Sequence, residues 1–216
     1  MLKGLKKDFS ILLLLSFWCI VLVFVRIYIT GSNAFLFMVY NLFLAWIPVV
    51  LAVIFKNYIA NYTQKKLSKN TIIIIIFISW LLFLPNTFYI FTDLFHIPAY
   101  PINKAPWFNL IFLLTFSLNG LFLGIVSLKI VSNSLSHLIT KYKIIIFETT
   151  VLLLSSYGVY LGRYLRWNSW GILVNPVGLF VDGSQAFFNP SALGMILVFF
   201  VMLQFCYFFY TDYRGG

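Results

Sequence analysis

Six apolar segments, separated by more polar connections, constrain the fold of this chain more than any other feature. They lie at residues 9–29, 34–55, 72–92, 107–131, 144–162 and 191–210. Each is about 20 residues long, which as a helix matches the roughly 30 Å hydrocarbon core of a bilayer. Arg26, Ile27 and Tyr28 stand where a signal peptide would carry small residues, so the first segment is predicted to be retained. The sequence therefore predicts an all-α protein, an integral membrane bundle of six transmembrane helices forming one domain over residues 1–216.

Composition supports a membrane protein and argues against a nucleic-acid-binding one. Hydrophobic residues make up 62% of the chain and charged residues only 9%, whereas soluble domains are about 25% charged. The net charge of +10 would suit a nucleic-acid partner. However, the basic residues flank apolar helices, as the positive-inside rule predicts. The expected partner is therefore membrane lipid, with no nucleic acid.

The basic residues also predict an orientation, because they gather on alternate connections. Those on one side are Lys3, Lys6, Lys7, Lys56, Lys65, Lys66, Lys69, Lys129, Lys141, Lys143 and Arg214. Those on the other side are Arg26, Lys104, Arg163 and Arg166. Since cytoplasmic loops carry the excess of Lys and Arg, we expect cytoplasmic N- and C-termini and three outward-facing connections. The expected location is the plasma membrane of a bacterium.

A polar stripe follows a proline in the third segment. Pro85 interrupts the helix and frees backbone groups that a polar partner must satisfy. After it come Asn86, Tyr89, Asp93 and His96, spaced by three, four and three residues. This spacing places the four side chains on one helical face. Because lipid does not tolerate such a stripe, we expect it to face the protein interior or a water-filled cavity.

The fifth segment carries a second stripe where it leaves the membrane. Arg163, Arg166, Trp167 and Trp170 are spaced to share one helical face. Both stripes are expected at the same outer level, and their charges are opposite. The sequence therefore predicts that Asp93 contacts Arg163 or Arg166.

Three interpretations of this constellation remain open. In the structural one, Asp93 and an arginine neutralise each other and the tryptophans anchor the helix at the interface. In the functional one, the arginines bind an anionic group and Asp93 or His96 handles a proton. In the third, Asp93, His96 and Asp182 bind a metal. With only 2 histidines in the chain the ligand set is thin, so neither a metal nor a cofactor is predicted.

Other polar and small residues inside the segments are expected to serve packing. The small residues Ser117, Gly120, Gly124, Ser127, Gly158 and Gly162 would let helices approach closely. Asn41 and Asn119 are expected to form hydrogen bonds between helices. Glu148 either reaches towards Lys141 or Lys143 or marks the inner end of a polar path.

Two blocks of the chain resemble the signature of a known family. Residues 84–96, LPNTFYIFTDLFH, resemble the LPNxxYxxTDLxH pattern of a family of bacterial multi-pass membrane proteins of unknown function. Residues 160–170, YLGRYLRWNSW, are similar to that family's YLGRxxRWNSW block. The resemblance covers about residues 72–182 and implies no activity. Family members often carry Asp where this chain has Asn109 and Gly171, which weakens a site built from several carboxylates.

The favoured functional prediction is recognition or processing of an anionic lipid or cell-envelope substrate at the outer leaflet. The candidate catalytic residues are Asp93 and His96, and the candidate substrate-binding residues are Arg163, Arg166, Asn86, Tyr89, Trp167, Asn168 and Trp170. A small transporter, with Asn119 and Glu148 in its inner half, is one alternative. A non-catalytic membrane scaffold for envelope machinery is the other. Whether the protein is an enzyme stays open.

The predicted orientation can be tested with topology reporters. A reporter after Arg214 and one within residues 56–70 should read as cytoplasmic, because both lie on the side rich in Lys and Arg. A reporter within residues 171–185 should read as external. An external signal from residues 56–70 would reverse the orientation.

Overall fold

The chain folds into helices of very different lengths. The computed structural model describes residues 2–60, 67–94, 106–167 and 171–215. The elements are α1 (Leu2–Thr30), α2 (Phe37–Ala60), α3 (Leu67–Phe83), α4 (Pro85–Thr92), α5 (Pro106–Leu135), α6 (Lys141–Arg163), α7 (Gly171–Val174), α8 (Pro176–Gln185), the 3-10 helix η2 (Ala186–Phe188) and α9 (Pro190–Gly215). Within the described ranges there is no strand, so the predicted all-α class is confirmed.

Six helical stretches of the described chain are long and apolar enough to cross a membrane. They are Lys7–Thr30, Phe37–Ala60, Asn70–Thr92, Trp107–Leu135, Lys141–Arg163 and Pro190–Asp212. These bounds lie within a few residues of the predicted segments. The third stretch joins α3 and α4 across the residue between them. The six spans give the chain the architecture of a multi-pass membrane protein.

The break between α3 and α4 follows from a single proline. Leu84 separates the two helices, and Pro85 is the first residue of α4. Proline is tolerated at that position because the amide hydrogen it lacks has no partner within the helix there. Asn86 donates its side-chain amide to the Phe83 carbonyl at 3.1 Å. The predicted interruption is confirmed, and a polar side chain satisfies one of the carbonyls at the break.

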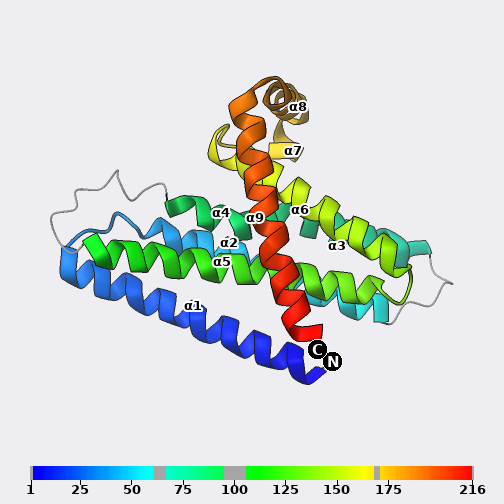
Figure 1. The fold of residues 1–216 in the computed structure, drawn as a ribbon, viewed down its shortest axis with the longest axis horizontal. Coiled ribbons are helices and arrows are strands. Elements are labelled where there is room, and N and C mark those ends of the chain that lie inside the picture. Colours follow the sequence, from blue (N-terminus) through cyan, green and yellow to red (C-terminus); the bar gives the residue numbers. More distant parts are fainter. Residues whose placement is uncertain (1, 61–66, 95–105, 168–170, 216) are drawn as a thin grey trace.

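Helix α5 lies at the centre of the bundle and contacts α1, α2 and α4. Of its membrane-spanning window 67% is buried, against 22–33% for the other five. Figure 1 shows α1, α2 and α5 running along the long axis of the molecule. The expected interhelical hydrogen bond of Asn119 is present, since its side-chain amide donates to Ser16 Oγ in α1 at 3.0 Å. The indole N–H of Trp80 in α3 donates to Ser127 Oγ of α5 at 2.8 Å.

Two glycines of α5 allow α4 to lie directly against it. A Cβ at Gly120 would stand 2.4 Å from the Thr87 carbonyl oxygen, and one at Gly124 would stand 2.4 Å from the Phe88 ring. On the opposite side of α4, a Cβ at Gly158 in α6 would lie 2.6 Å from Pro85 Cγ. The expected close approach of helices at these small residues is confirmed. It holds α4 firmly between α5 and α6.

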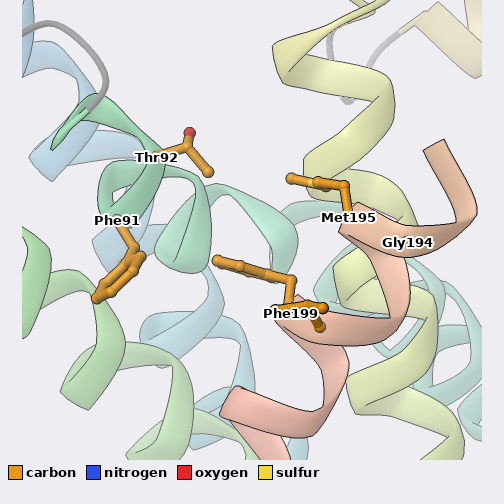
Figure 2. A pocket seen from close by; sticks show the side chains of 6 residues that line it. Phe91, Thr92, Gly194, Met195 and Phe199 are labelled. Carbon is orange, nitrogen blue, oxygen red and sulfur yellow. The ribbon is translucent and has the colours of Figure 1, made fainter. Parts of the chain in front are cut away.

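Helix α9 is arranged differently from the others. Figure 1 shows it crossing the direction of α1, α2 and α5, with α7 and α8 beside its N-terminal part. It packs mainly on α6, and at its C-terminal end Tyr210 donates a hydrogen bond to Asp8 of α1 at 3.0 Å. Near its N-terminal end, a cleft of about 340 Å³ opens between α9 and α4 (Figure 2).

The close packing of α5 against α4 at Gly120 predicts that alanine destabilises the protein more at this glycine than at an uncrowded one. Gly120→Ala should lower the stability of the detergent-solubilised protein by about 1–3 kcal/mol, because a backbone oxygen occupies the space of the new methyl group. Gly194→Ala in α9 is the matched control, since nothing lies within 4 Å of a Cβ there. Thermal unfolding measures both. Equal melting temperatures for the two variants would contradict the packing argument.

Candidate functional site

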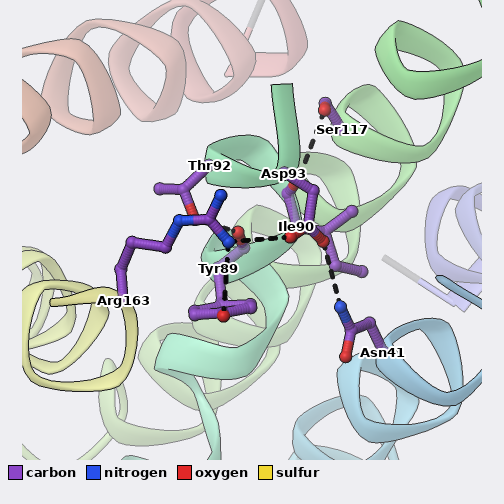
Figure 3. A network of polar contacts seen from close by, with 7 residues as sticks. All are labelled: Asn41, Tyr89, Ile90, Thr92, Asp93, Ser117 and Arg163. Carbon is purple, nitrogen blue, oxygen red and sulfur yellow. Dashed lines mark hydrogen bonds and ion pairs between the residues drawn. The ribbon is translucent and has the colours of Figure 1, made fainter. Parts of the chain in front are cut away.

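Asp93 is the centre of a polar cluster at the end of α4 (Figure 3). It caps the C-terminus of that helix, and only 1% of its surface is exposed. Asn41 of α2 donates its side-chain amide to Asp93 Oδ2 at 3.0 Å. Arg163 donates from Nη1 to Asp93 Oδ1 at 3.2 Å. Side chains from α2, from the end of α4 and from α6 thus form one network. Of the two partners predicted for Asp93, Arg163 is in contact with it.

Arg163 reaches this cluster from the last residue of α6. Its Nη1 also lies 3.4 Å from the Tyr89 hydroxyl oxygen, and its Cζ is 5.7 Å from the centre of the Tyr89 ring. This is within the distance at which a guanidinium is attracted to an aromatic face. The Arg163 side chain is 14% exposed, whereas that of Asp93 is 1% exposed. The cation is therefore the more accessible partner of the pair.

Backbone contacts around the cluster hold Tyr89 and the end of α4 in place. Thr92 Oγ donates to the Tyr89 carbonyl at 2.6 Å, and Ser117 Oγ of α5 donates to the Ile90 carbonyl at 3.3 Å. A Cβ at Gly162 would lie 3.4 Å from the Tyr89 ring. The Thr92 hydrogen bond lies within α4, whereas Ser117 belongs to α5 and Gly162 to α6, so the helices that pack on α4 also help to position the site.

The surroundings of Asp93 change the acidity of its carboxyl group. Asp93 lies one residue beyond the third span, Asn70–Thr92. Burial raises its pKa to about 6, although the Asn41 hydrogen bond and the Arg163 charge both lower it. Above that pH the carboxylate is charged and neutralises Arg163. Below it the carboxyl is protonated, and the guanidinium loses its counter-charge.

The prediction that Arg166 and Trp167 share a helical face with Arg163 is wrong. Helix α6 ends at Arg163, Tyr164 caps it, and Arg166 is exposed with a left-handed backbone (φ 57°). Trp167 turns away and donates its indole N–H to Asp182 of α8 at 3.0 Å. Helical spacing therefore does not apply after Arg163, because the chain has already left the helix.

The other predicted site residues have mixed outcomes. Asn86 and Tyr89 lie on α4, but Asn86 donates to the α3–α4 break while Tyr89 contacts Arg163. His96, Asn168 and Trp170 lie outside the described residues. Sequence reasoning gave Asn41 a hydrogen bond between helices but no place in the site. The sequence signal that could have placed Asn41 in the site is its side-chain amide, which stands in an otherwise apolar segment.

The metal interpretation gains no support from the described side chains. Among them, no three His, Cys, Asp or Glu residues are grouped so as to hold a metal ion. Asp182 accepts a hydrogen bond from Trp167, and His96 is not part of the described chain.

A partly buried carboxylate, Glu148, lies towards the other end of α6. Glu148 accepts hydrogen bonds from the hydroxyls of Ser132 in α5 and Tyr207 in α9. Within the described residues its partners are these hydroxyls, while Lys141 and Lys143 are exposed. Of the two roles predicted for Glu148, the contacts fit an inward-facing group better than one that reaches out towards the lysines.

Six membrane-length helical stretches, with an ion pair between buried Asp93 and partly exposed Arg163, define a multi-pass α-helical membrane protein with a polar site at one end of α4. A family model described as Protein of unknown function (DUF1361) matches residues 40–206, and the chain belongs to this family. The match covers α4, α5 and α6, which hold the cluster. No curated protein and no solved structure matches the chain.

The backbone at Arg166 allows a test of whether this side chain serves structure or function. A left-handed conformation costs a non-glycine residue about 1–2 kcal/mol. Arg166→Gly should therefore leave the melting temperature unchanged or raise it, whereas Arg166→Val should lower it because β-branched residues fit this conformation worst. A clear loss of stability in Arg166→Gly would indicate that the arginine side chain holds the fold.

Proposed function

We propose that this end of the bundle recognises or processes an anionic lipid or cell-envelope substrate at the outer leaflet of a bacterial plasma membrane. The observation that carries the proposal is the pairing of a fully buried Asp93 with a partly exposed Arg163 at 3.2 Å. A guanidinium held at a membrane boundary suits recognition of phosphate or carboxylate groups. The basic-residue pattern supports placing this end outside.

In this proposal an anionic group displaces Asp93 as the partner of Arg163. The exchange is favoured when Asp93 takes up a proton, because the buried carboxyl is then neutral and the cation needs a new counter-charge. A pKa of about 6 allows Asp93 to accept or return a proton near neutral pH. Tyr89 orients the guanidinium through its hydroxyl and ring.

The remaining candidate residues have supporting roles in the proposal. Arg166 is exposed next to the end of α6 and adds a second positive charge for the substrate. Trp167 ties this segment to α8 through Asp182. His96, Asn168 and Trp170 are proposed from their sequence positions alone, with His96 as the second proton-handling group.

A small transporter is the second candidate, and Glu148 is the observation that favours it. A carboxylate inside a membrane span costs free energy even when two hydroxyls donate to it, so its presence suggests a function. Asn119 lies between the two ends of α5, and its side-chain Oδ1 is buried without a hydrogen-bond partner among the described residues. Such groups would line the inner half of a polar route.

Charge removal at the ion pair separates a functional role from a structural one. Arg163→Gln alone should destabilise the protein by about 3–5 kcal/mol, because it leaves the buried Asp93 without its partner. Asp93→Asn alone should cost less, because the guanidinium that it leaves unpaired is partly exposed. The double variant should recover most of this stability. If the pair serves a substrate, the double variant should fold and insert but fail to replace the wild-type gene in its host. Thermal unfolding in detergent and complementation of a deletion strain provide the two measurements.

The outcomes of this experiment discriminate among the candidates. Full complementation by a well-folded double variant would refute the site and leave the scaffold hypothesis. Glu148→Gln is the comparison variant in the same host. It should complement if the function lies at the Asp93 end alone, and should fail if a polar route through the bundle is required.

A further inference from the structure

The cleft between α4 and α9 is almost entirely apolar. It is lined by Phe91, Thr92, Gly194, Met195, Val198 and Phe199. Figure 2 shows the Met195 and Phe199 side chains extending from α9 towards α4. The hydroxyl of Thr92, the polar member of this set, already donates to the Tyr89 carbonyl at 2.6 Å. The cleft therefore suits a hydrocarbon occupant rather than a polar one.

The cleft lies within the membrane spans and opens to the side. Its residues belong to the spans Asn70–Thr92 and Pro190–Asp212, near one end of each. Val198 is 72% exposed, so one wall faces the surroundings of the bundle, which are lipid. The Phe91 and Phe199 rings meet edge to face at 6.0 Å and close one side. Gly194 leaves room, since nothing lies within 4 Å of a Cβ built there.

The cleft reaches the polar cluster through consecutive residues of α4. Thr92 lines the cleft and Asp93, the next residue, pairs with Arg163 at 3.2 Å. The end of α4 therefore borders the apolar cleft on one side and contacts the Arg163 cation of α6 on the other. This arrangement is complementary to an amphiphile with a negative headgroup and a hydrocarbon chain.

The size of the cleft favours a lipid chain over a helix of another protein. About 340 Å³ is at the lower end of the roughly 300–1,000 Å³ typical of small-molecule pockets. A helix docking in a groove uses several anchors over two or more turns. The lining residues of α4 are confined to Phe91 and Thr92, which is too short a wall for such an interface.

We propose that the α4–α9 cleft holds a hydrocarbon chain of an anionic membrane lipid whose headgroup lies at Arg163. The inference rests on the proposed function and specifies its substrate class as a lipid rather than a soluble envelope component. Gly194 provides the space for the chain, and Arg163 provides the charge for the headgroup. A larger side chain at Gly194 competes with the lipid chain but leaves the ion pair intact.

Native mass spectrometry of the delipidated full chain with added lipid tests this proposal. The probes are a long-chain phosphatidylglycerol, its dihexanoyl counterpart and a long-chain phosphatidylcholine. The wild type should bind the first most tightly. Gly194→Phe and Val198→Phe should each bind it about tenfold more weakly, since the loss of burial for about two methylene groups suffices for that change. Leu197→Phe, at an exposed position on another face of α9, should bind like the wild type.

Each outcome has a distinct meaning, provided that thermal unfolding shows the variants to be folded. Wild-type binding of the long-chain lipid by both Gly194→Phe and Val198→Phe would overturn the chain site. The proposed function would survive that result if the Asp93→Asn, Arg163→Gln double variant lost the preference for phosphatidylglycerol over phosphatidylcholine. Loss of binding in the cleft variants, with that preference unchanged in the double variant, would keep the chain site and remove Arg163 from headgroup recognition. Equal affinity of the wild type for dihexanoyl and long-chain phosphatidylglycerol would also refute the chain site.

Discussion

A carboxylate buried among apolar helices requires a cation and hydrogen-bond donors nearby, and much of the bundle is arranged to provide them for Asp93. Asn41 comes from α2 and Arg163 from α6, with N–O distances of 3.0 and 3.2 Å. Neither donor could reach the carboxylate unless α4 lay close to both helices. The electrostatic requirement at one residue therefore depends on packing along the whole of α4.

That packing depends in turn on the missing side chains of glycines and on the break at Pro85. Gly120 and Gly124 bring α5 against α4, and Gly158 lets α6 approach Pro85. Pro85 begins α4 at this break, and Asn86 donates its side-chain amide to the Phe83 carbonyl there.

The sequence predicts well the features that depend on local composition. The six spans follow from runs of apolar residues, and the break follows from the proline at position 85. The contact between Asp93 and Arg163 was predictable because two opposite charges at one membrane depth have few other partners. The departure of Arg166 from the helix was not predictable, since helical spacing assumes that the helix continues. The hydroxyl partners of Glu148 depend on how α5, α6 and α9 meet, which hydropathy does not encode.

The hydrogen bond between Tyr210 and Asp8 joins residues 202 positions apart, near the two ends of the chain. During synthesis α1 enters the membrane long before α9 is made, so this contact can form only after residue 210 has been translated. The carboxylate of Asp8 is buried in the finished protein. Completion of the bundle is thus a late step of biogenesis, and a chain truncated before α9 would lack the contact that fastens its first helix to its last.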